Sequence, residues 1–561
     1  MNGAEALVRM LQLNGVKHVF GLCGDTSLPF YDALARLDHG IDHILTRDER
    51  SAGYMADAYA RVTGRVGVCE GPSGGGATYL LPGLVEANES SIAVLGITSD
   101  VSVGSRGKFP LTELDQQQLY RPLTKWNTTV DRADQIPGAV RGAFRAMTTG
   151  RPGAAHICLP YDLQKQEVDG NDVWAQEGHQ RFPAMRARPD PTEVDKAADQ
   201  LVASRSPVII CGGGVIIAGA CEALETLAIL LNAPVCTTVS GKGTLADEHP
   251  LNAGVVGTNG GVAATREVVM QADLVLFVGA RAGSTTTEHW KYPARGVPIL
   301  HIDNDAMTIG TNYRTRVALV GDALLALADL NAAIRERLDR RASNAADGRA
   351  IASRARGVKR ADFAALAAST DAPIKPERVV DALNRLLPAK SILVADPGTP
   401  CPYFSAYFQA PQAGRHFITN RAHGALGFAM SAGVGASFGR PDAMVVAAMG
   451  DGSFNFTCGE LETIVRRGVP LKMIVFSNSV FGWIKASQKT GYGERYFSVD
   501  FDRTDHARVA EAFGVKAWKV ENPADVESAI KAALAYDGPA LVDVISQPLQ
   551  DTAVPVSQWM G

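Results

Sequence analysis

Cysteine is scarce in this sequence and never occurs in pairs. The 561 residues include eight cysteines, and no two of them form a C-x-x-C motif. Structural zinc sites and disulfide frameworks both need cysteines at close, regular spacing, so the sequence predicts neither. Scattered thiols of this kind are typical of a reducing compartment. We therefore expect a cytoplasmic protein without structural disulfides.

Long apolar runs and blocks of one charge are also missing. No run of roughly 18 uncharged apolar residues is present that could span a membrane. The N-terminal segment carries charges throughout and places Leu7, Met10 and Leu11 on one helical face, unlike a signal peptide. The 55 basic and 59 acidic residues are interleaved and give a net charge of −4, without a basic patch for phosphate backbones. We expect neither a membrane nor a nucleic acid among the partners.

What the sequence does contain is a repeated alternation of helical and strand-like segments. With 561 residues, 46% of them hydrophobic, the chain is long enough for several cores. Short runs rich in Val and Ile alternate with helical stretches, which predicts parallel sheets with helices on both faces. We expect an α/β protein with three doubly wound parallel-sheet domains, at residues 1–170, 191–335 and 376–561. Segment 164–189 is typical of a linker, and segment 336–375 of a helical connector.

One strand–helix–strand stretch of the third domain carries polar residues at both strand ends. The apolar run 444–449 ends at Gly450-Asp451-Gly452, and the run 471–476 ends at Ser477-Asn478. Parallel strands end on the same side of a sheet, where open α/β sheets bind ligands. Carboxylate, amide and carbonyl oxygens suit Mg²⁺ or Ca²⁺, and glycines let the backbone approach a diphosphate. A simple Asp-Gly turn and an Asn cap, with no metal, are the alternative.

This stretch resembles the metal- and diphosphate-binding motif of the thiamine-diphosphate enzymes. Ser477 replaces the first Asn of the family's pair, whereas the second, which ligates the metal, is kept as Asn478. The resemblance implies that Asp451, Asn478 and the Val480 carbonyl hold Mg²⁺ on thiamine diphosphate. The cofactor-binding residues implied for this stretch are Gly450, Asp451, Gly452, Ser453 and Asn478.

The first domain contains a segment, residues 46–64, that resembles the pyrimidine-binding segment of the same family. Within it, Glu49 follows an apolar run and stands at the start of a predicted helix over residues 51–63. The resemblance implies that Glu49 is catalytic, because this Glu hydrogen-bonds the cofactor's aminopyrimidine ring in the family. An acid in the first helical turn also complements the helix dipole without any catalytic role. The glycine-rich segment 71–78 is similar to the family's loop beside the cofactor, and an ordinary strand-to-helix turn is its alternative.

Two more segments of the third domain are expected to bind the cofactor. A strand over residues 392–396 leads into a turn at Gly398 and Thr399, whose backbone amides could hold a phosphate. Segment 420–430 resembles the family segment whose large apolar residue wedges under the cofactor and bends it, and this position is Leu426. The resemblance also implies that backbone groups of Gly424 and Leu426 hold the pyrimidine edge.

His423 is the only histidine within these family-like segments. If it is catalytic, it acts as a proton shuttle near neutral pH. A surface or helix-cap position is the alternative for a lone histidine.

The residues that select the reaction match the family less closely. Segment 112–126 resembles the corresponding region of acetolactate synthases, with Thr112 where those enzymes have Gln. The adjacent histidines of pyruvate-type decarboxylases are missing, and Glu70 and Ser73 stand near the histidine position of enzymes similar to benzoylformate decarboxylase. Without these proton donors, carboligation is favoured over the release of an aldehyde.

The segment 481–488 follows the metal-binding turn directly, so we expect it to line the substrate side. Its candidate substrate residues are Trp483, Lys485 and Gln488. Lys485 would pair with a carboxylate or sulfonate of the substrate, or would lie solvated on an amphipathic helix.

The middle domain has strand-then-glycine patterns, such as residues 207–214, that could cradle a nucleotide at a helix N-terminus. They lack the full spacing and the distal acid of a dinucleotide fingerprint. In the family that the chain resembles, this domain binds FAD, ADP or no nucleotide. The sequence after Gly279-Ala280-Arg281 departs from that of acetolactate synthases, so the absence of FAD is favoured.

The resemblance implies a thiamine-diphosphate- and Mg²⁺-dependent carboligase similar to acetolactate synthase, acting on pyruvate or a related 2-oxo acid. The alternative is a non-oxidative 2-oxo acid decarboxylase or C–C lyase that releases an aldehyde. A non-catalytic subunit that kept the fold is a third alternative, against which intact Glu49, Asp451 and Asn478 argue. Because different protomers supply the Glu and metal halves of one site in this family, a homodimer or homotetramer is expected.

Overall fold

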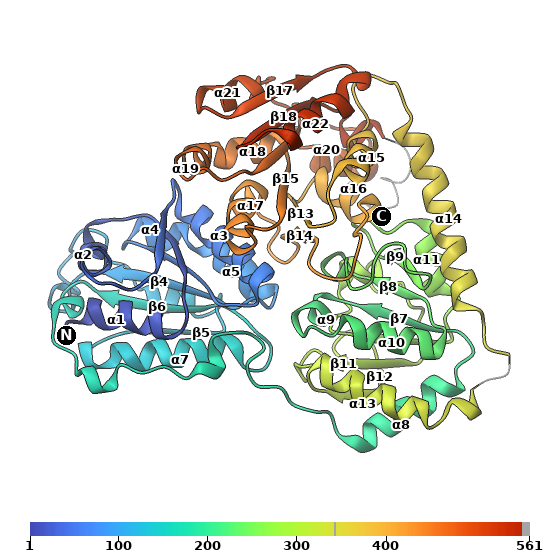
Figure 1. The fold of residues 1–561 in the computed structure, drawn as a ribbon, viewed down its shortest axis with the longest axis horizontal. Helices are drawn as coiled ribbons and strands as arrows, with labels where there is room; N and C mark the ends of the chain where they lie inside the picture. The colour runs from blue at the N-terminus through green and yellow to red at the C-terminus, as the bar shows by residue number, and fades with distance from the viewer. Residues whose placement is uncertain (342–343, 553–561) are drawn as a thin grey trace. The chain divides into compact units, whose positions relative to one another are not determined.

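Three parallel sheets dominate the computed structural model, which describes residues 1–341 and 344–552 (Figure 1). Each sheet has six strands and is flanked by helices, so the predicted α/β class is confirmed. Each sheet lies within one of the three predicted domain ranges, and residues 553–561 of the last range lie outside the described residues. In the described part of the chain, no helix is long and apolar enough to cross a membrane.

The first sheet has the strand order β2-β1-β3-β4-β6-β5. Its strands are β1 (His18–Gly21), β2 (Asp42–Leu45), β3 (Gly67–Gly71), β4 (Val94–Asp100), β5 (Trp126–Thr129) and β6 (Ala155–Pro160). The chain leaves β1 toward β2 on one side and resumes at β3 on the other. Such a switch point opens a ligand crevice at the carboxyl ends of the strands, here between β1 and β3.

The third sheet repeats this order strand for strand, as β14-β13-β15-β16-β18-β17. Its strands are β13 (Ser391–Ala395), β14 (Phe417–Thr419), β15 (Met444–Gly450), β16 (Lys472–Ser477), β17 (Lys516–Val520) and β18 (Ala540–Ile545). Its switch point therefore lies between β13 and β15. Both strands end in segments that the sequence predicts to bind the cofactor.

The middle sheet has the order β12-β11-β10-β7-β8-β9, which is the 3-2-1-4-5-6 order of dinucleotide-binding folds. Its strands are β7 (Pro207–Cys211), β8 (Val235–Thr237), β9 (Asn252–Val255), β10 (Leu274–Val278), β11 (Ile299–Asp303) and β12 (Thr315–Val320). At its switch point, a Cβ on Gly212 would lie 2.2 Å from the Gly279 carbonyl oxygen. The two turns thus meet backbone to backbone, which only glycine allows there.

The helices fill the connections between strands. Those of the first range are α1 (Gly3–Leu13), α2 (Leu28–Arg36), α3 (Glu49–Thr63), α4 (Gly75–Tyr79), α5 (Leu81–Glu89), α6 (Gln116–Tyr120) and α7 (Ile136–Thr148). The middle range and the connector hold α8 (Pro191–Ala203), α9 (Gly213–Ile217), α10 (Cys221–Leu231), α11 (Ala263–Met270), α12 (Ser284–Thr287), α13 (Ala323–Arg335) and α14 (Gly348–Ala367). The last range holds α15 (Pro376–Leu386), α16 (Pro400–Tyr407), α17 (Phe428–Gly439), α18 (Asp451–Thr457), α19 (Leu461–Arg466), α20 (Gly482–Gly491), α21 (His506–Ala512) and α22 (Val526–Ala535).

The chain forms two compact units. The first contains Met1–Met185, Asn420–Val445 and Asn455–Leu471, and the second contains the described residues of Arg186–Thr419, Val446–Phe454 and Lys472–Gly561. Segment 420–445, which carries Leu426 and α17, therefore packs in the same unit as the first sheet, although it follows the middle domain in sequence. The domain boundaries drawn from the sequence stay a prediction.

In the first unit, α17 packs directly against α3. A Cβ on Gly435 would lie 2.0 Å from the Met55 carbonyl oxygen, so the two backbones touch at this glycine. The Ser431 hydroxyl also donates to the Ser51 hydroxyl at 3.0 Å. This close approach fixes α3, the helix that begins at Glu49.

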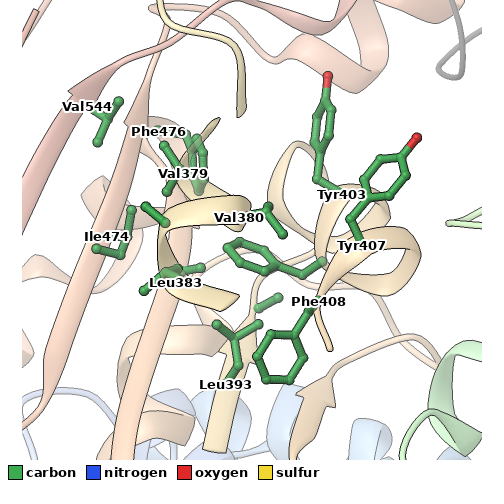
Figure 2. Close-up of a cluster of buried hydrophobic side chains, with 14 of the residues drawn as sticks. Val379, Val380, Leu383, Leu393, Tyr403, Tyr407, Phe408, Ile474, Phe476 and Val544 are labelled. Atoms are coloured by element: carbon green, nitrogen blue, oxygen red, sulfur yellow. The ribbon is translucent and has the colours of Figure 1, made fainter. Parts of the chain in front are cut away.

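In the second unit, α15 and α16 bury a hydrophobic cluster against the third sheet (Figure 2). Val379 and Leu383 of α15 and Tyr403 of α16 lie in one cluster with Ile474 of β16 and Val544 of β18, all buried. The strand that carries Asn478 at its end is thus anchored in the core. A rigid strand is what a precisely placed ligand group requires.

The contact between α3 and α17 predicts that Gly435→Ala destabilises the protein. The added methyl group meets backbone that cannot rotate away, so we expect a loss of about 1–3 kcal/mol. Gly357→Ala is the matched control, because Gly357 lies in α14 and a Cβ there meets nothing within 4 Å. Replacing that helical glycine with alanine should stabilise the protein by about 0.5–1 kcal/mol. Thermal unfolding midpoints compare the two variants, and equal midpoints would contradict the contact.

Candidate functional site

The predicted metal-binding turn lies at the ends of two adjacent parallel strands. β15 ends at Gly450, α18 begins with Asp451, and β16 ends at Ser477, one residue before Asn478. Asp451 Oδ2 accepts the backbone N–H groups of Asn478 at 2.8 Å and Ser479 at 2.6 Å. Asp451 and Asn478, which are far apart in sequence, are therefore brought together as predicted.

The chemistry of this turn fits a hard divalent cation. Asp451 is buried, and burial raises the pKa of its carboxyl group. Hydrogen bonds from three backbone N–H groups favour the charged form and oppose this shift. The Asn478 side-chain N–H₂ is buried and has no hydrogen-bond partner among the described residues. Mg²⁺ prefers oxygen ligands, which Asp451 supplies through its carboxylate and Asn478 through its amide oxygen, whereas the unpaired N–H₂ group is only a hydrogen-bond donor. Val480 is also buried there, and Ser479 before it has a φ of 58°.

His, Cys, Asp and Glu side chains alone would not make this site. Across residues 1–341 and 344–552, no three of them are grouped so that they could hold a metal ion. The proposed ligand set instead combines one carboxylate with an amide and a backbone carbonyl.

A polar cluster that the sequence did not predict supports the turn from inside. The Ser477 hydroxyl donates to Asp543 Oδ1 at 2.5 Å and lies 2.9 Å from His506 Nδ1. Asp543 Oδ2 accepts the His506 backbone N–H at 3.1 Å, and all three residues are buried. Ser477, which replaces the family's Asn, is therefore hydrogen-bonded within a buried network, in which His506 Nε2 has no partner among the described residues. An acid within the apolar strand 540–545 was the signal for it, because a buried charge needs partners.

The turn after β13 lies at the same switch point. Gly398 has a φ of 92°, and a Cβ there would meet nothing within 4 Å, so the backbone faces open space. Thr399 is buried, and its hydroxyl would lie 3.3 Å from a Cβ on Gly482. Backbone open to space at a strand end is suited to an approaching phosphate group.

Glu49 is the first residue of α3, which begins two residues before the predicted helix. Asp48 caps the helix by accepting the Arg50 N–H at 2.7 Å. Only 7% of Glu49 is exposed, and burial is the main cause of the raised pKa of its carboxyl.

Two glycines form a cradle around the Glu49 side chain. A Cβ on Gly71 would lie 3.3 Å from Glu49 Cγ, and a Cβ on Gly76 would lie 3.0 Å from Glu49 Oε1. Glycines at these positions leave the carboxyl group accessible to a flat ligand on that side. This arrangement fits the proposed pyrimidine contact better than a helix-dipole role, which needs no burial.

A second buried acid, Glu70, lies at the end of β3 and was not predicted as a site residue. The Tyr31 hydroxyl donates to Glu70 Oε1, and His43 Nε2 lies 3.0 Å from the Tyr31 hydroxyl and 3.3 Å from Glu70 Oε1. The Glu70 charge contributes to the raised pKa of Glu49. A glutamate inside an otherwise apolar strand was the signal, since such a position is costly unless it is used.

The Leu426 turn is tied to the buried core of the first unit. Glu86 Oε2 accepts the His423 backbone N–H at 2.7 Å, and Asn420 Nδ2 donates to the Ala425 carbonyl at 2.6 Å. Arg61 Nη2 donates to the other oxygen of Glu86 at 3.0 Å. Leu426 is half-buried in this turn, while His423 is exposed. The backbone of His423 therefore has a structural role, and its side chain reaches solvent.

Thr112 lies in the irregular segment between β4 and α6 and has a φ of 71°. Its hydroxyl lies 2.7 Å from the Ser73 hydroxyl, and its Cβ would be 2.8 Å from a Cβ on Gly74. The structure thus brings Thr112 to the glycine-rich loop near Glu49. This pairing links the predicted acceptor residue to the first half of the site.

The candidate substrate residues lie on α20. Gln488 exchanges two hydrogen bonds of 3.1 Å with the Phe497 backbone, and Lys485 forms a 2.5 Å ion pair with Asp500. Trp483 is half-buried against the core of the second unit. Lys485 and Gln488 therefore hold the segment 492–500 against the helix.

Comparison with known proteins identifies relatives of the whole chain. The family description "Thiamine pyrophosphate enzyme, N-terminal TPP binding domain" matches residues 1–119, the central domain of that family matches 194–330, and its C-terminal TPP binding domain matches 396–544. A probable acetolactate synthase large subunit of Methanocaldococcus jannaschii is 35% identical over 559 residues, 98% of this chain and 93% of that protein. Its counterpart in Methanococcus aeolicus is 34% identical over 560 residues, 98% of this chain and 92% of that protein. An acetolactate synthase large subunit of Mycobacterium tuberculosis is 33% identical over 553 residues, 97% and 88% of the two chains.

The cluster behind the metal-binding turn predicts that Ser477→Ala destabilises the protein. The change leaves the buried Asp543 carboxylate without its hydroxyl donor, which should cost about 1–3 kcal/mol. The control is Ser528→Ala on α22, where an exposed hydroxyl bonds only the Asp525 carbonyl. That change should stay within about 0.5 kcal/mol. Denaturant unfolding measures both, and a neutral Ser477→Ala would show that the cluster does not support the turn.

The burial of Glu49 predicts that Glu49→Gln stabilises the protein without cofactor. Since the folded pKa of Glu49 is raised, its ionised form costs stability, and this cost grows as pH rises from the unfolded pKa through the folded one. The melting temperature of Glu49→Gln should therefore exceed that of the unchanged protein increasingly between acidic and alkaline pH. Glu462→Gln, which removes a surface charge on α19, is the control and should show no such trend. A difference independent of pH would contradict the burial of a charged Glu49.

Proposed function

Because the chain belongs to the thiamine-pyrophosphate enzyme family that includes acetolactate synthase large subunits, we propose that it is a thiamine-diphosphate-dependent carboligase acting on pyruvate or a related 2-oxo acid. The observation that carries the proposal is the pair of strand-end sites. One is Glu49 in its glycine cradle, and the other is Asp451 bonded to the Asn478 turn. These residues support a cofactor site with one half at Glu49 and the other at Asp451.

The residues present fit thiamine diphosphate with Mg²⁺. Asp451, Asn478 and the Val480 carbonyl are the proposed metal ligands, and the hydrogen bonds from the Asn478 turn to the buried Asp451 carboxylate support this assignment. The diphosphate is assigned to the backbone at Gly398, Thr399, Gly450, Gly452 and Ser453. When bound, the cofactor supplies the carbon that attacks the 2-oxo acid and takes up the electron pair left by CO₂.

Glu49 is the proposed catalytic acid of the chain. A carboxyl group with a raised pKa holds a proton more readily and shares it with a ring nitrogen. The half-buried Leu426 would offer an apolar surface to the cofactor, and the Gly424 and Leu426 backbone groups would hold its pyrimidine edge. His423, with its exposed side chain, is proposed as a proton shuttle at the site opening.

The acceptor side of the reaction is assigned to Thr112 and to α20. Thr112 offers a hydroxyl beside Ser73, and Trp483 offers an apolar surface to the substrate. The ion pair between Lys485 and Asp500 supports a role for Lys485 in holding segment 492–500 against α20. Gln488 shares this role through its hydrogen bonds with Phe497, so that both residues order the substrate side.

The proposal extends to assembly, the middle domain and location. A homodimer or homotetramer would combine Glu49 of one copy with the metal-binding turn of another. No flavin is included, since the sequence after Gly279-Ala280-Arg281 departs from that of acetolactate synthases. The eight free cysteines support a cytoplasmic location, because reduced thiols persist there.

Incubation of the purified protein with pyruvate, thiamine diphosphate and Mg²⁺ tests the function. We expect release of CO₂ and formation of an acyloin, with acetolactate as the product of two pyruvate molecules. Glu49→Gln should lower the rate by about 10²–10⁴-fold, the usual contribution of a positioned acid. Glu462→Gln should retain the rate.

The products separate the candidate reactions. Free aldehyde as the main product would replace the carboligase with a decarboxylase or C–C lyase. Unchanged turnover in Glu49→Gln would overturn the role of Glu49, and no CO₂ from any 2-oxo acid would overturn the decarboxylating reaction itself.

A further inference from the structure

A small cavity in the second unit lies apart from the strand-end sites. Its volume is about 20 Å³, and it is bounded by β9, by the connector helix α14 and by α16. The residues that line it are Asp247, Asn252, Gly254, Arg356, Lys359, Arg360, Phe363, Ala406, Tyr407, Phe408 and Gln409. A cavity of this size admits one or two water-sized groups.

The Lys359 side chain brings an uncompensated charge to this cavity. Its ammonium donates no hydrogen bond and forms no ion pair with any residue that the structure describes. It approaches the β9 backbone, since its Nζ would lie 3.1 Å from a Cβ on Gly254. Lys359 is half-buried, and a partly desolvated cation without a partner is stabilised when an anion joins it.

The other charges around the cavity already have partners. Lys242 pairs with Asp247 at 3.3 Å, and Asp247 also accepts the Ala410 N–H at 2.7 Å. Arg360 pairs with Glu248.

Arg356 contributes a further positive charge without an acidic partner. Its Nη1 donates to the carbonyl groups of His249, Pro250 and Asn252 at 2.6–3.2 Å. These carbonyls carry no net charge. Burial is the main cause that lowers the pKa of Lys359 to about 8. The positive charges of Lys242, Arg356 and Arg360 act in the same direction, and the negative charge of Asp247 opposes them. The cavity therefore has an excess of positive charge.

Aromatic rings form the other wall of the cavity. Phe363 of α14 and Tyr407 of α16 stack with ring centroids 4.5 Å apart. Figure 2 shows the Tyr407 and Phe408 rings at the end of α16, beside the buried cluster of α15. Apolar walls make the cavity a poor site for a strongly hydrated divalent anion and a better one for a weakly hydrated monovalent anion.

We propose that this cavity is a binding site for a small monovalent anion, a halide or a carboxylate group, held by the Lys359 ammonium between α14 and the aromatic wall. The anion supplies the partner that Lys359 lacks. It also links the connector helix to β9 and α16, since the cavity touches all three elements. Bound anion favours the protonated amine, so binding and proton uptake at Lys359 are coupled.

Competitive labelling of the full-length protein tests the site. Trace acetic anhydride at pH 8 acetylates deprotonated amines, and mass spectrometry of peptides reports Lys359. The salts compared at equal ionic strength are potassium chloride, acetate and 2-methylpropanoate, with bulky gluconate as the reference. At an anion concentration ten times the Kd, Lys359 labelling should slow about elevenfold, because only the empty fraction reacts. Labelling of Lys531, an exposed lysine on α22, should not change.

The salts distinguish the source of the anion. Protection by chloride and acetate alike identifies a site for any small anion. Stronger protection by 2-methylpropanoate identifies an apolar carboxylate that also uses the aromatic wall. Equal labelling of Lys359 in all four salts would overturn the proposal, because no anion would then protect the amine. If Lys359 does not label in gluconate, the reagent is too large for the cavity and the melting temperatures of the Lys359→Met variant decide.

A variant provides the second measurement. Lys359→Met keeps the side-chain length and removes the charge, and Lys531→Met is the matched control. Chloride or acetate should raise the melting temperature of the unchanged protein and of Lys531→Met relative to gluconate, but not that of Lys359→Met. A melting-temperature shift of the same size in Lys359→Met would contradict the proposal, because the anion would then act at another site. If Lys359→Met does not fold, Lys359→Gln repeats the measurement and the labelling of the unchanged protein decides.

Discussion

The Asp451 carboxylate ties the ends of β15 and β16 together. It accepts backbone N–H groups from its own turn and from Asn478 and Ser479, and it is buried. A buried carboxylate without such donors would be too costly to keep. The backbone of the turn at Asn478 and Ser479 is therefore held by this one charged group.

The opposite side of the same turn is held by Ser477. Ser477 is the last residue of β16, and its buried side chain faces the interior. There the Ser477 hydroxyl contacts Asp543 Oδ1 and His506 Nδ1. The turn is thus fixed from the core and from the edge, which is how a rigid scaffold positions ligand groups.

Buried acids recur at the strand ends of the first sheet. Glu49 begins α3 shortly after β2, Glu70 lies in β3, and the Glu70 charge contributes to the raised pKa of Glu49. Nothing in the stability of the fold requires them, and a neutral side chain would be cheaper to bury. Their position at this edge fits the proposed cofactor site, and the cavity at Lys359 in the second unit has an excess of positive charge instead.

What the sequence by itself determined is the local framework. Strand ends and the helix after Glu49 could be predicted, although α3 begins two residues earlier than expected, because periodicity and turn residues act between neighbours along the chain. The roles of Glu49, Asp451 and Asn478 came from the family resemblance and stay a prediction. The three parallel sheets followed from the same alternation. What only the tertiary structure decided are the partners that meet across hundreds of residues. Glu70 with Tyr31 and His43, Ser477 with Asp543, and Glu86 with the His423 backbone depend on strand order and on the rotation of each side chain. Lys359 is the clearest case, since its missing partner is visible only once β9, α14 and α16 enclose it. A one-dimensional pattern records which residues can be buried, whereas the balance of charge around each is set by the packing.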